Sequence, residues 1–422
     1  QTQTRLVLEA PPGAGKTTQV PIALLNSIWR GDKKIIMLEP RRVAARAAAG
    51  FMSKQLCEAV GDTVGYRIRF ENKISSKTKI EVVTEGILTR MIQEDPTLEN
   101  VAAIIFDEFH ERHLSADLGL ALALDIQQSL REDLRIIVMS ATLDGEKLSQ
   151  FLQAERITSA GRSYPVVTAH FVARRDEALT FQIKRCVEEA LQKHEGDLLV
   201  FLPGQREIRQ VENALQSSGA VTENISLISL FGEMPIEKQS EALAPDKNGK
   251  RRIVLATNIA ESSVTLPGVR VVIDSGLSRE PRFDPNSGFS RLDTVAISQA
   301  SADQRAGRAG RVADGWCYRC WPASQRLESM RSAEISQTEL SGLCLELAAW
   351  GSTDLRFVDT PPSGVMAAAQ ELLQRLEAID KNRRITETGK KILALGTHPR
   401  IAAMLLAAKD ETEKSLACDL AA

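Results

Sequence analysis

Short runs of uninterrupted apolar residues recur along the first three quarters of the chain, separated by stretches of mixed polarity. The segments Val101–Phe106 and Arg135–Ser140 are typical. In the second segment the apolar residues lie between Arg135 and Ser140, and polar residues follow. A continuous apolar run is what a parallel strand needs when helices cover both faces of its sheet. Alternation of such runs with helical stretches predicts an α/β fold built on doubly wound parallel sheets.

The alternation falls into two series and then stops. Residues 1–160 hold the first series and residues 161–324 the second, with a turn-rich linker near 160–165. From about residue 325 the apolar positions follow helical spacing, most clearly over 367–376. We therefore expect two α/β domains followed by a helical part, and we expect the two domains to fold without the residues beyond about 330. The strands of the second series are predicted near 198–202, 252–256 and 269–274.

A phosphate-binding loop is predicted between the first apolar run and the first helix. Its sequence is Ala10-Pro11-Pro12-Gly13-Ala14-Gly15-Lys16-Thr17. Small residues let consecutive backbone N–H groups turn toward a phosphate at the positive end of the following helix, while the lysine reaches the β- and γ-phosphates. The first position is Ala rather than Gly, and an ordinary glycine turn is the alternative interpretation. The loop predicts a bound nucleoside triphosphate.

Two acidic residues come directly after the apolar run that ends at Phe106. Because ligands bind at the carboxyl ends of strands in doubly wound sheets, Asp107 can hold Mg²⁺ while Glu108 orients the attacking water. A solvated turn is the alternative for an Asp-Glu pair taken alone. Together with an upstream phosphate loop, the pair predicts a nucleotide hydrolase.

A basic block, Gln304-Arg305-Ala306-Gly307-Arg308-Ala309-Gly310-Arg311, lies in the second series. Arginines three residues apart face one way on a helix, and their planar forks suit phosphate oxygens. A basic surface helix or a nucleic-acid contact is the alternative interpretation. The block gives candidate arginine fingers, supplied by the domain that has no phosphate loop.

Two further segments of the second series have a structural interpretation. Residues 276–297 flank a polar turn with extended stretches and predict a β-hairpin, which could also be an ordinary exposed ribbon. Cys317 and Cys320 have metal-ligand spacing, but no second Cys or His pair accompanies them, so they are interpreted as strand residues.

Taken together, these segments resemble the DEAH-box group of superfamily 2 helicases. The resemblance rests on the loop, the basic block and these segments in family order: Glu39-Pro40-Arg41-Arg42, Val64-Gly65-Tyr66-Arg67-Ile68-Arg69-Phe70-Glu71, Thr84-Glu85-Gly86, Asp107-Glu108-Phe109-His110-Glu111-Arg112, Ser140-Ala141-Thr142, Phe201-Leu202-Pro203-Gly204-Gln205 and Ala256-Thr257-Asn258-Ile259-Ala260-Glu261-Ser262-Ser263. Phe109, Glu39 and the pair Trp350-Gly351 are similar to the bacterial HrpB branch of that group.

The resemblance implies two tandem RecA-like domains, a winged-helix domain over 325–397 and the start of a ratchet-like helical domain over 398–422. It implies an ATP-dependent RNA helicase that uses ATP and Mg²⁺, with the hairpin helping to hold the strand. The implied nucleotide contacts are Gly13, Ala14, Gly15, Lys16, Thr17, Thr18, Asp107, Leu243 and Ser263, with Thr17 and Asp107 at Mg²⁺. The implied catalytic residues are Glu108, His110, Gln304, Arg308 and Arg311, and the implied RNA contacts are Arg42, Thr84, Gln205 and Thr257.

The composition of the chain limits how it can bind nucleic acid and argues against a membrane span. The net charge is −2, so single-stranded RNA would bind in a local basic groove rather than on a generally basic surface. No apolar stretch is long enough for a membrane span and no signal peptide opens the chain, so we expect a cytoplasmic location. We also expect a monomer, and the resemblance implies that the chain belongs to a longer protein. An ATP-switched RNA clamp that does not unwind, and a DNA-acting helicase of the same superfamily, remain open as alternatives.

Overall fold

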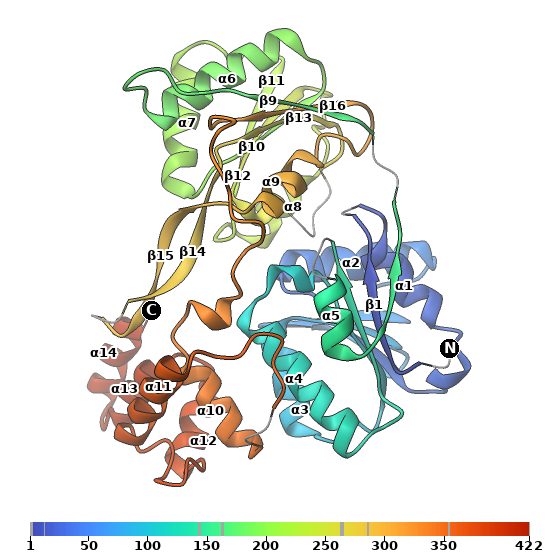
Figure 1. The fold of residues 1–422 in the computed structure, drawn as a ribbon, viewed down its shortest axis with the longest axis vertical. Coiled ribbons are helices and arrows are strands. Elements are labelled where there is room, and N and C mark those ends of the chain that lie inside the picture. Colours follow the sequence, from blue (N-terminus) through green and yellow to red (C-terminus); the bar gives the residue numbers. More distant parts are fainter. Residues whose placement is uncertain are drawn as a thin grey trace.

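The computed structural model describes residues 3–11, 13–141, 145–161, 164–261, 266–284, 287–352 and 355–421. Figure 1 shows two α/β domains, one above the other, with a helical part beside the lower domain. Within the described residues, no helix combines the length and the apolar character that a bilayer crossing requires.

The first domain is built on an eight-stranded sheet in the order β4-β3-β5-β2-β6-β7-β1-β8. All neighbouring strands are parallel except the β3–β4 pair. β6 is buried along its whole length, as the apolar run predicted. The elements are β1 (Arg5–Glu9), α1 (Lys16–Leu24), η1 (Ile28–Arg30), β2 (Lys34–Leu38), α2 (Arg42–Gln55), β3 (Val64–Ile68), β4 (Glu71–Lys73), β5 (Ile80–Val83), α3 (Glu85–Glu94), β6 (Val101–Phe106), η2 (Phe109–Glu111), α4 (Leu114–Ser129), β7 (Arg135–Ser140), α5 (Gly145–Leu152) and β8 (Glu155–Thr158).

The second domain carries a six-stranded parallel sheet in the order β11-β12-β10-β13-β16-β9. The three predicted strands correspond to β10, β12 and β13. Cys317 is buried in the middle of β16 and Cys320 is buried just after the strand, and no metal-binding cluster occurs among the described residues. The elements are β9 (Val166–His170), α6 (Leu179–Lys193), β10 (Asp197–Phe201), α7 (Gln205–Ser217), β11 (Ile225–Leu230), α8 (Ile236–Leu243), β12 (Arg251–Ala256), η3 (Asn258–Ala260), β13 (Val269–Asp274), β14 (Leu277–Asp284), β15 (Phe289–Ala296), α9 (Gln299–Ala306) and β16 (Gly315–Arg319).

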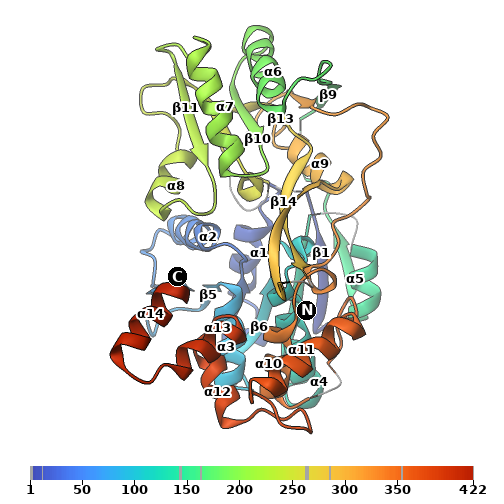
Figure 2. The ribbon, with the colours of Figure 1, turned by 90° about the vertical axis from the view of Figure 1, so that its left-hand side faces the viewer.

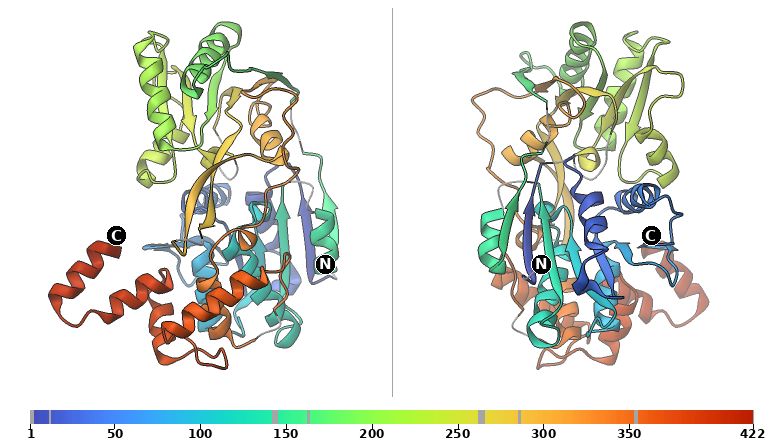
Figure 3. Two further views of the ribbon diagram at one scale, coloured as in Figure 1. Left: turned by 60° about the vertical axis from the view of Figure 1, so that its left-hand side comes forward. Right: turned by 90° about the vertical axis from the view of Figure 1, so that its right-hand side faces the viewer.

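The predicted hairpin is confirmed as the antiparallel pair β14–β15, which projects from the second domain toward the helical part (Figure 3). Its turn includes Pro285 and Asn286, which lie outside the described residues. Beside the turn, the backbone oxygen of Ser287 accepts a hydrogen bond from Arg400 at 3.2 Å. The same guanidinium lies over the ring of Phe289, so the end of the hairpin is docked on the helical part.

The helical part shares one hydrophobic core with the first domain. Leu340, Leu343 and Leu373 belong to the same buried cluster as Leu88 and Leu122 of α3 and α4. This argues against the expectation that both α/β domains fold without the residues beyond 330, because removing them would expose one side of the first domain's core. The elements are η4 (Glu334–Ser336), α10 (Ser341–Trp350), α11 (Ser363–Arg375), α12 (Glu387–Ala394), α13 (Pro399–Ala407) and α14 (Glu411–Ala421).

Candidate nucleotide site at the domain interface

The phosphate loop connects β1 to α1 in the first domain. Gly13 and Gly15 have φ angles of 85° and 83°, in the left-handed region that favours glycine. α1 begins at Lys16, so the free N–H groups of its first turn point into the loop, where the helix dipole favours an anion. This geometry supports a phosphate-binding loop over an isolated glycine turn.

Lys16 is buried in the loop, and its Nζ donates to the backbone oxygen of Ala10 at 2.5 Å. Ala10 is itself fixed to the end of β7, because its N–H donates to the oxygen of Ser140 at 3.2 Å. The alanine at the first loop position is therefore compatible with a formed loop. Thr18 points its hydroxyl back toward Gly15 O, at 3.4 Å.

Asp107 lies at the carboxyl end of β6, beside the phosphate loop. Oδ1 accepts the N–H of Glu108 at 2.8 Å, whereas Oδ2 is buried and has no hydrogen-bond partner in the part of the chain that the structure describes. Burial, and then the charge of Glu108, raise the pKa of Asp107, while Thr17 and Lys16 act against this rise. A buried carboxylate oxygen beside a threonine hydroxyl is a donor set that suits Mg²⁺, so these residues fit the predicted ion.

Glu108 adopts a strained backbone, with φ 50° and ψ 33°, and directs the chain into the short helix η2. One turn later, His110 contacts both domains. Nδ1 accepts the N–H of Ala141 at 3.3 Å and lies 3.5 Å from Oε2 of Glu108, and Nε2 lies 3.2 Å from the side-chain amide nitrogen of Gln304 in the second domain. His110 therefore links the Asp-Glu box to Gln304 of the second domain.

The two candidate fingers reach the first domain from turns and not from a helix. The expectation of a helix through the basic block is wrong beyond Ala306, because α9 ends there and turns follow over residues 307–310. At Gly310 a Cβ would lie 2.5 Å from the backbone oxygen of Tyr164, so only glycine fits there. The turns place Arg308 and Arg311 at the interface.

Both guanidiniums are close to Glu108, and that of Arg311 also lies against the phosphate loop. A Cβ placed on Gly13 would lie 3.4 Å from Nε of Arg311. Arg308 is buried, and its Nε donates to the backbone oxygen of Glu261 at 3.0 Å. Burial, and then the neighbouring Arg311, lower the pKa of Arg308, while Glu108 acts in the opposite direction. Two cations held this close together create a field that favours an anion between the domains.

Sequence reasoning missed the ion pairs that support the fingers. Arg305 is 1% exposed and donates to Glu261 at 2.8 Å and to Asp274 at 2.9 Å. These pairs fix the end of α9 to the carboxyl end of β13, directly behind Arg308. The only sequence signal for these pairs was that Arg305 is one more arginine inside the basic block. Its partners, Glu261 and Asp274, lie in other segments of the chain.

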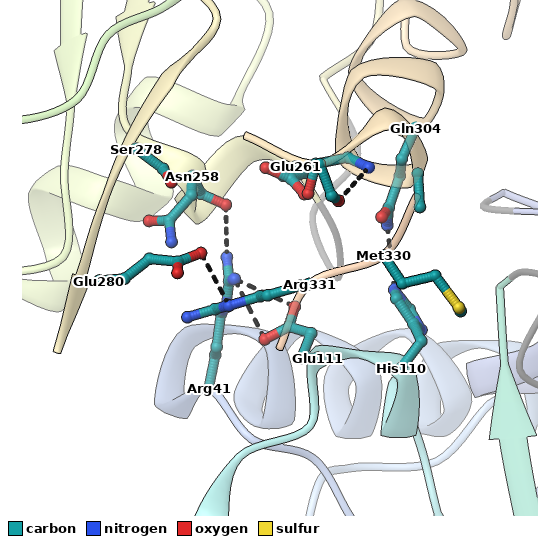
Figure 4. Close-up of a pocket in the computed structure, with 13 residues that line it drawn as sticks. Arg41, His110, Glu111, Asn258, Glu261, Ser278, Glu280, Gln304, Met330 and Arg331 are labelled. Atoms are coloured by element: carbon teal, nitrogen blue, oxygen red, sulfur yellow. Dashed lines mark hydrogen bonds and ion pairs between the residues drawn. The ribbon is translucent and has the colours of Figure 1, made fainter. Parts of the chain in front are cut away.

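The sequence analysis also missed Arg41 as an interdomain contact, although it predicted the neighbouring Arg42 as an RNA contact. Figure 4 shows the Arg41 guanidinium between the two domains, pointing toward Asn258 and Glu111. It donates to the backbone oxygen of Asn258 at 2.9 Å and to the Glu111 carboxylate at 3.0 and 3.2 Å. Arg41 thus ties the end of the Asp-Glu box to the second domain.

The four predicted RNA contacts lie where strands end and helices begin. Arg42 is exposed at the start of α2, and Gln205 is half-buried at the start of α7. Thr84 and Thr257 occupy the position before α3 and before η3, but neither side chain caps its helix. Capping, the ordinary use of a threonine at that position, therefore does not account for them.

Ser263 and Leu243, like the other predicted site residues, remain predictions. Ser263 lies outside the described residues. Leu243 is the last residue of α8 and packs against the hydrophobic core of the second domain. Core packing was the alternative interpretation of this leucine.

Two helicase families match the chain in the regions that carry this site. Residues 1–151 match the DEAD/DEAH box helicase family, and residues 182–313 match the helicase conserved C-terminal domain. With the phosphate loop, the Asp-Glu box and the paired arginines in place between two parallel-sheet domains, the chain belongs to the DEAD/DEAH box helicases.

Similar proteins place it further within that family. The ATP-dependent RNA helicase HrpB of Escherichia coli strain K12 is 45% identical over 99% of this chain and 52% of its own length. The ATP-dependent RNA helicase HrpA of Borreliella burgdorferi is 35% identical over 92% of this chain and 48% of its own length. A crystal structure of the Escherichia coli DEAH/RHA helicase HrpB superimposes with a TM-score of 0.91 at 44% identity, over 99% of this chain and 54% of that one. The chain thus spans about half the length of the relatives it matches.

Proposed function

We propose that the chain is the motor portion of an ATP-dependent RNA helicase, which couples ATP hydrolysis to movement along single-stranded RNA. One observation carries the proposal. Arg308 of the second domain is buried near Glu108 of the first domain, and the half-buried Arg311 lies near Glu108 and against Gly13 of the phosphate loop. Residues of this kind complete a hydrolysis site only when the two domains are together.

Each side chain has a role that its position supports. The phosphate loop and Lys16 hold the phosphates, and Thr17 and Asp107 hold Mg²⁺, which when bound neutralises charge on the phosphate oxygens. Glu108, with Gln304, orients the attacking water and takes up its proton. His110, bonded to Ala141 and beside Gln304, keeps the two domains in register at that point.

The closed arrangement explains how hydrolysis can depend on the strand. Arginine fingers contribute on the order of 10³ to 10⁵ in rate, so hydrolysis is slow whenever the domains are apart. A strand held by Arg42 and Thr84 on one domain, and by Gln205 and Thr257 on the other, favours closure. Each cycle of closure and opening then moves the strand by one step.

These contacts are directed at phosphates, which position a strand without reading its sequence. We infer little sequence preference and a salt-dependent affinity, with a slope of roughly −0.7 for each neutralised phosphate. A monomeric state and a cytoplasmic location are part of the proposal.

The decisive experiment is strand displacement on matched RNA and DNA duplexes with single-stranded tails, with ATP hydrolysis recorded in parallel. The proposal requires RNA-stimulated hydrolysis and displacement of the RNA duplex. Hydrolysis without displacement would favour an RNA clamp, and displacement of DNA alone would favour a DNA helicase. Lys16→Ala should abolish hydrolysis, whereas Glu108→Gln should abolish it but keep ATP binding. A Glu108→Gln variant with the parent rate would contradict the assigned role of Glu108.

A further inference from the structure

A short segment C-terminal to the second domain, Met330 to Glu334, passes over the interdomain cavity of Figure 4 before the helical part begins. We call it the strap. At its first end, Nε of Arg331 forms an ion pair with Oε1 of Glu280 on β14, at 3.0 Å. The two side chains are 21% and 13% exposed, so the pair is partly shielded from water. This end of the strap is attached to the hairpin of the second domain.

The other end of the strap is attached to the residues immediately after the Asp-Glu box. The backbone N–H of Glu334 donates to the oxygen of Arg112 at 3.0 Å. Its carboxylate accepts the N–H of Leu114 at 2.8 Å and lies 3.3 Å from Nδ1 of His113. Three contacts to consecutive residues fix Glu334 against the start of α4.

From Glu334 the contacts continue back to the second domain. His113 Nε2 lies 2.7 Å from Glu111 Oε2, and Glu111 accepts two hydrogen bonds from Arg41. Arg41 in turn donates to the backbone oxygen of Asn258, the residue after Thr257. Glu334, His113, Glu111 and Arg41 thus form one line of alternating negative and positive charge that ends at the other domain.

The charges in this line depend on one another because the groups are largely buried. Burial lowers the pKa of His113, but the hydrogen bonds to Glu111 and Glu334 outweigh it and raise the pKa to about 10. The imidazole is therefore charged at neutral pH and donates from both nitrogens. If Glu334 loses its charge, His113 and Glu111 lose part of what fixes their orientation, and Arg41 loses part of its support.

We propose that Glu334 is a positioning residue for ATP hydrolysis, acting through His113 and Glu111 on the contact that Arg41 makes with the second domain. The inference rests on the proposed function and adds a regulatory input to it. Because Glu334 leads directly into the helical part, closure of the nucleotide site depends on where that part sits. A strand that shifts the helical part would change the hydrolysis rate without contacting the nucleotide.

Glu334→Gln tests this in the 422-residue chain. The amide keeps the size of the side chain and an oxygen for the Leu114 N–H but removes the charge that faces His113. We expect kcat to fall about 2- to 30-fold, with and without oligouridylate, at an unchanged KM for ATP. Glu328→Gln is the matched control, because Glu328 is exposed two residues before the strap. It should retain the parent kcat.

A double-mutant cycle with His113→Gln separates positioning from general destabilisation. If the two residues act in one line, the double variant should lose no more kcat than the more affected single variant. Thermal melts of all variants show whether the loss of kcat exceeds any loss of folded protein at the assay temperature. If Glu334→Gln does not fold, the same measurement on His113→Gln replaces it.

Three outcomes would overturn the positioning role: a parent-like kcat for Glu334→Gln, losses that multiply in the double variant, or a fall in kcat that matches the fall in folded fraction. The proposed function fails differently. A parent chain whose hydrolysis did not respond to oligouridylate would contradict the RNA helicase assignment, whereas the comparison of basal kcat between variants would still decide the role of Glu334.

Discussion

The side chain of Arg311, at the end of the basic block, lies against Gly13 in the phosphate loop of the other domain. A Cβ at Gly13 would be 3.4 Å from Nε of Arg311, an ordinary van der Waals contact. The loop and the arginine therefore face the same space, in which the terminal phosphate of a nucleotide would lie. This relationship makes the role of the arginines testable apart from nucleotide binding.

Arg308→Ala and Arg311→Ala should each lower kcat by about 10³-fold or more while changing ATP affinity little. The reason is that arginines supplied by the second domain stabilise charge in the transition state, whereas Lys16 and the loop hold the ground-state phosphates. Single-turnover hydrolysis and equilibrium binding of a fluorescent ATP analogue measure the two quantities. Arg326→Ala, at an exposed arginine beyond the end of β16, serves as control. Affinity that fell as far as kcat would identify both arginines as binding residues.

The pH dependence of stability should report on Glu85, the first residue of α3. Burial raises the pKa of Glu85 to about 7, although the charge of His113 acts against this rise, and Oε1 has no hydrogen-bond partner among the described residues. An unfolded glutamate titrates near 4.5. Between these values the folded chain binds more protons, so stability falls as pH rises from about 4.5 to 7 and stays reduced above it.

Glu85→Gln removes the charge and should therefore stabilise the chain at pH 8 by about 3 kcal/mol, from roughly 1.4 kcal/mol per pKa unit. At pH 4.5 the gain should be below about 0.5 kcal/mol, because the parent carboxyl is then protonated in the folded chain and half protonated in the unfolded chain. Urea unfolding at the two pH values measures the difference. Glu94→Gln, at the exposed end of the same helix, should show no such dependence. An equal gain at both pH values would mean that packing, not charge, limits stability here.

The shared core predicts that damage in the helical part weakens nucleotide binding by the first domain. Leu343 of α10 is 3% exposed within that core, so Leu343→Ala should cost about 2–5 kcal/mol. ATP binding should then be lost at a lower urea concentration than in the parent. Leu416→Ala, at a side chain 59% exposed on α14, is the control and should leave the midpoint unchanged. Separate unfolding of the helical part, with ATP binding intact, would show that the two regions are independent.

We expect the protein to discriminate only weakly between nucleotide bases. Leu243 has no aromatic face and packs into the second domain's core. An exposed aromatic candidate is Phe51, which is 57% exposed on α2, the helix that contacts α8 across the interface (Figure 2). A single stacked ring adds roughly 0.5–1.5 kcal/mol and does not distinguish bases strongly. We expect kcat/KM for ATP, GTP, CTP and UTP to agree within about a hundredfold.

Phe51→Ala should raise KM for all four nucleotides by a similar factor, about 2- to 10-fold. Phe181→Ala, at a ring 61% exposed on α6, provides the control. A preference for ATP beyond a hundredfold would reveal a hydrogen-bonding contact to the adenine edge. A Phe51→Ala variant with unchanged KM values would place the base elsewhere.

The sequence was informative where one short segment contains a complete functional motif. The phosphate loop and the Asp-Glu box each join a strand to the next helix, so local pattern placed Lys16 and Asp107 at the same sheet edge. The helix expected through Arg308 was wrong because helical spacing was weighed without the close approach of Gly310 to the backbone of Tyr164, which only the packed chain shows. A close contact with a distant segment can override a favourable spacing.

Contacts between distant segments could not be predicted in this way. The pairs Arg41–Asn258 and Glu334–His113 join residues whose sequence neighbourhoods carry no sign of each other, and only the packed chain brings them together. The same holds for the core that Leu343 shares with the first domain. Apolar spacing showed that the C-terminal segment is helical, but a helix pattern does not say which surface its apolar face will cover.

The docked end of the hairpin has a mechanical consequence. The first domain packs on the helical part, the helical part holds the hairpin through Arg400, and the hairpin belongs to the second domain, which contacts the first at Arg41. Three bodies joined at three points form a closed linkage. A rotation at any one joint must be matched by movement or rupture at another, so opening the nucleotide cleft would either bend the two-stranded ribbon or release Ser287 from Arg400. The β14–β15 hairpin would then resist opening elastically, and the hydrogen bond between Ser287 and Arg400 would limit how far the cleft can open.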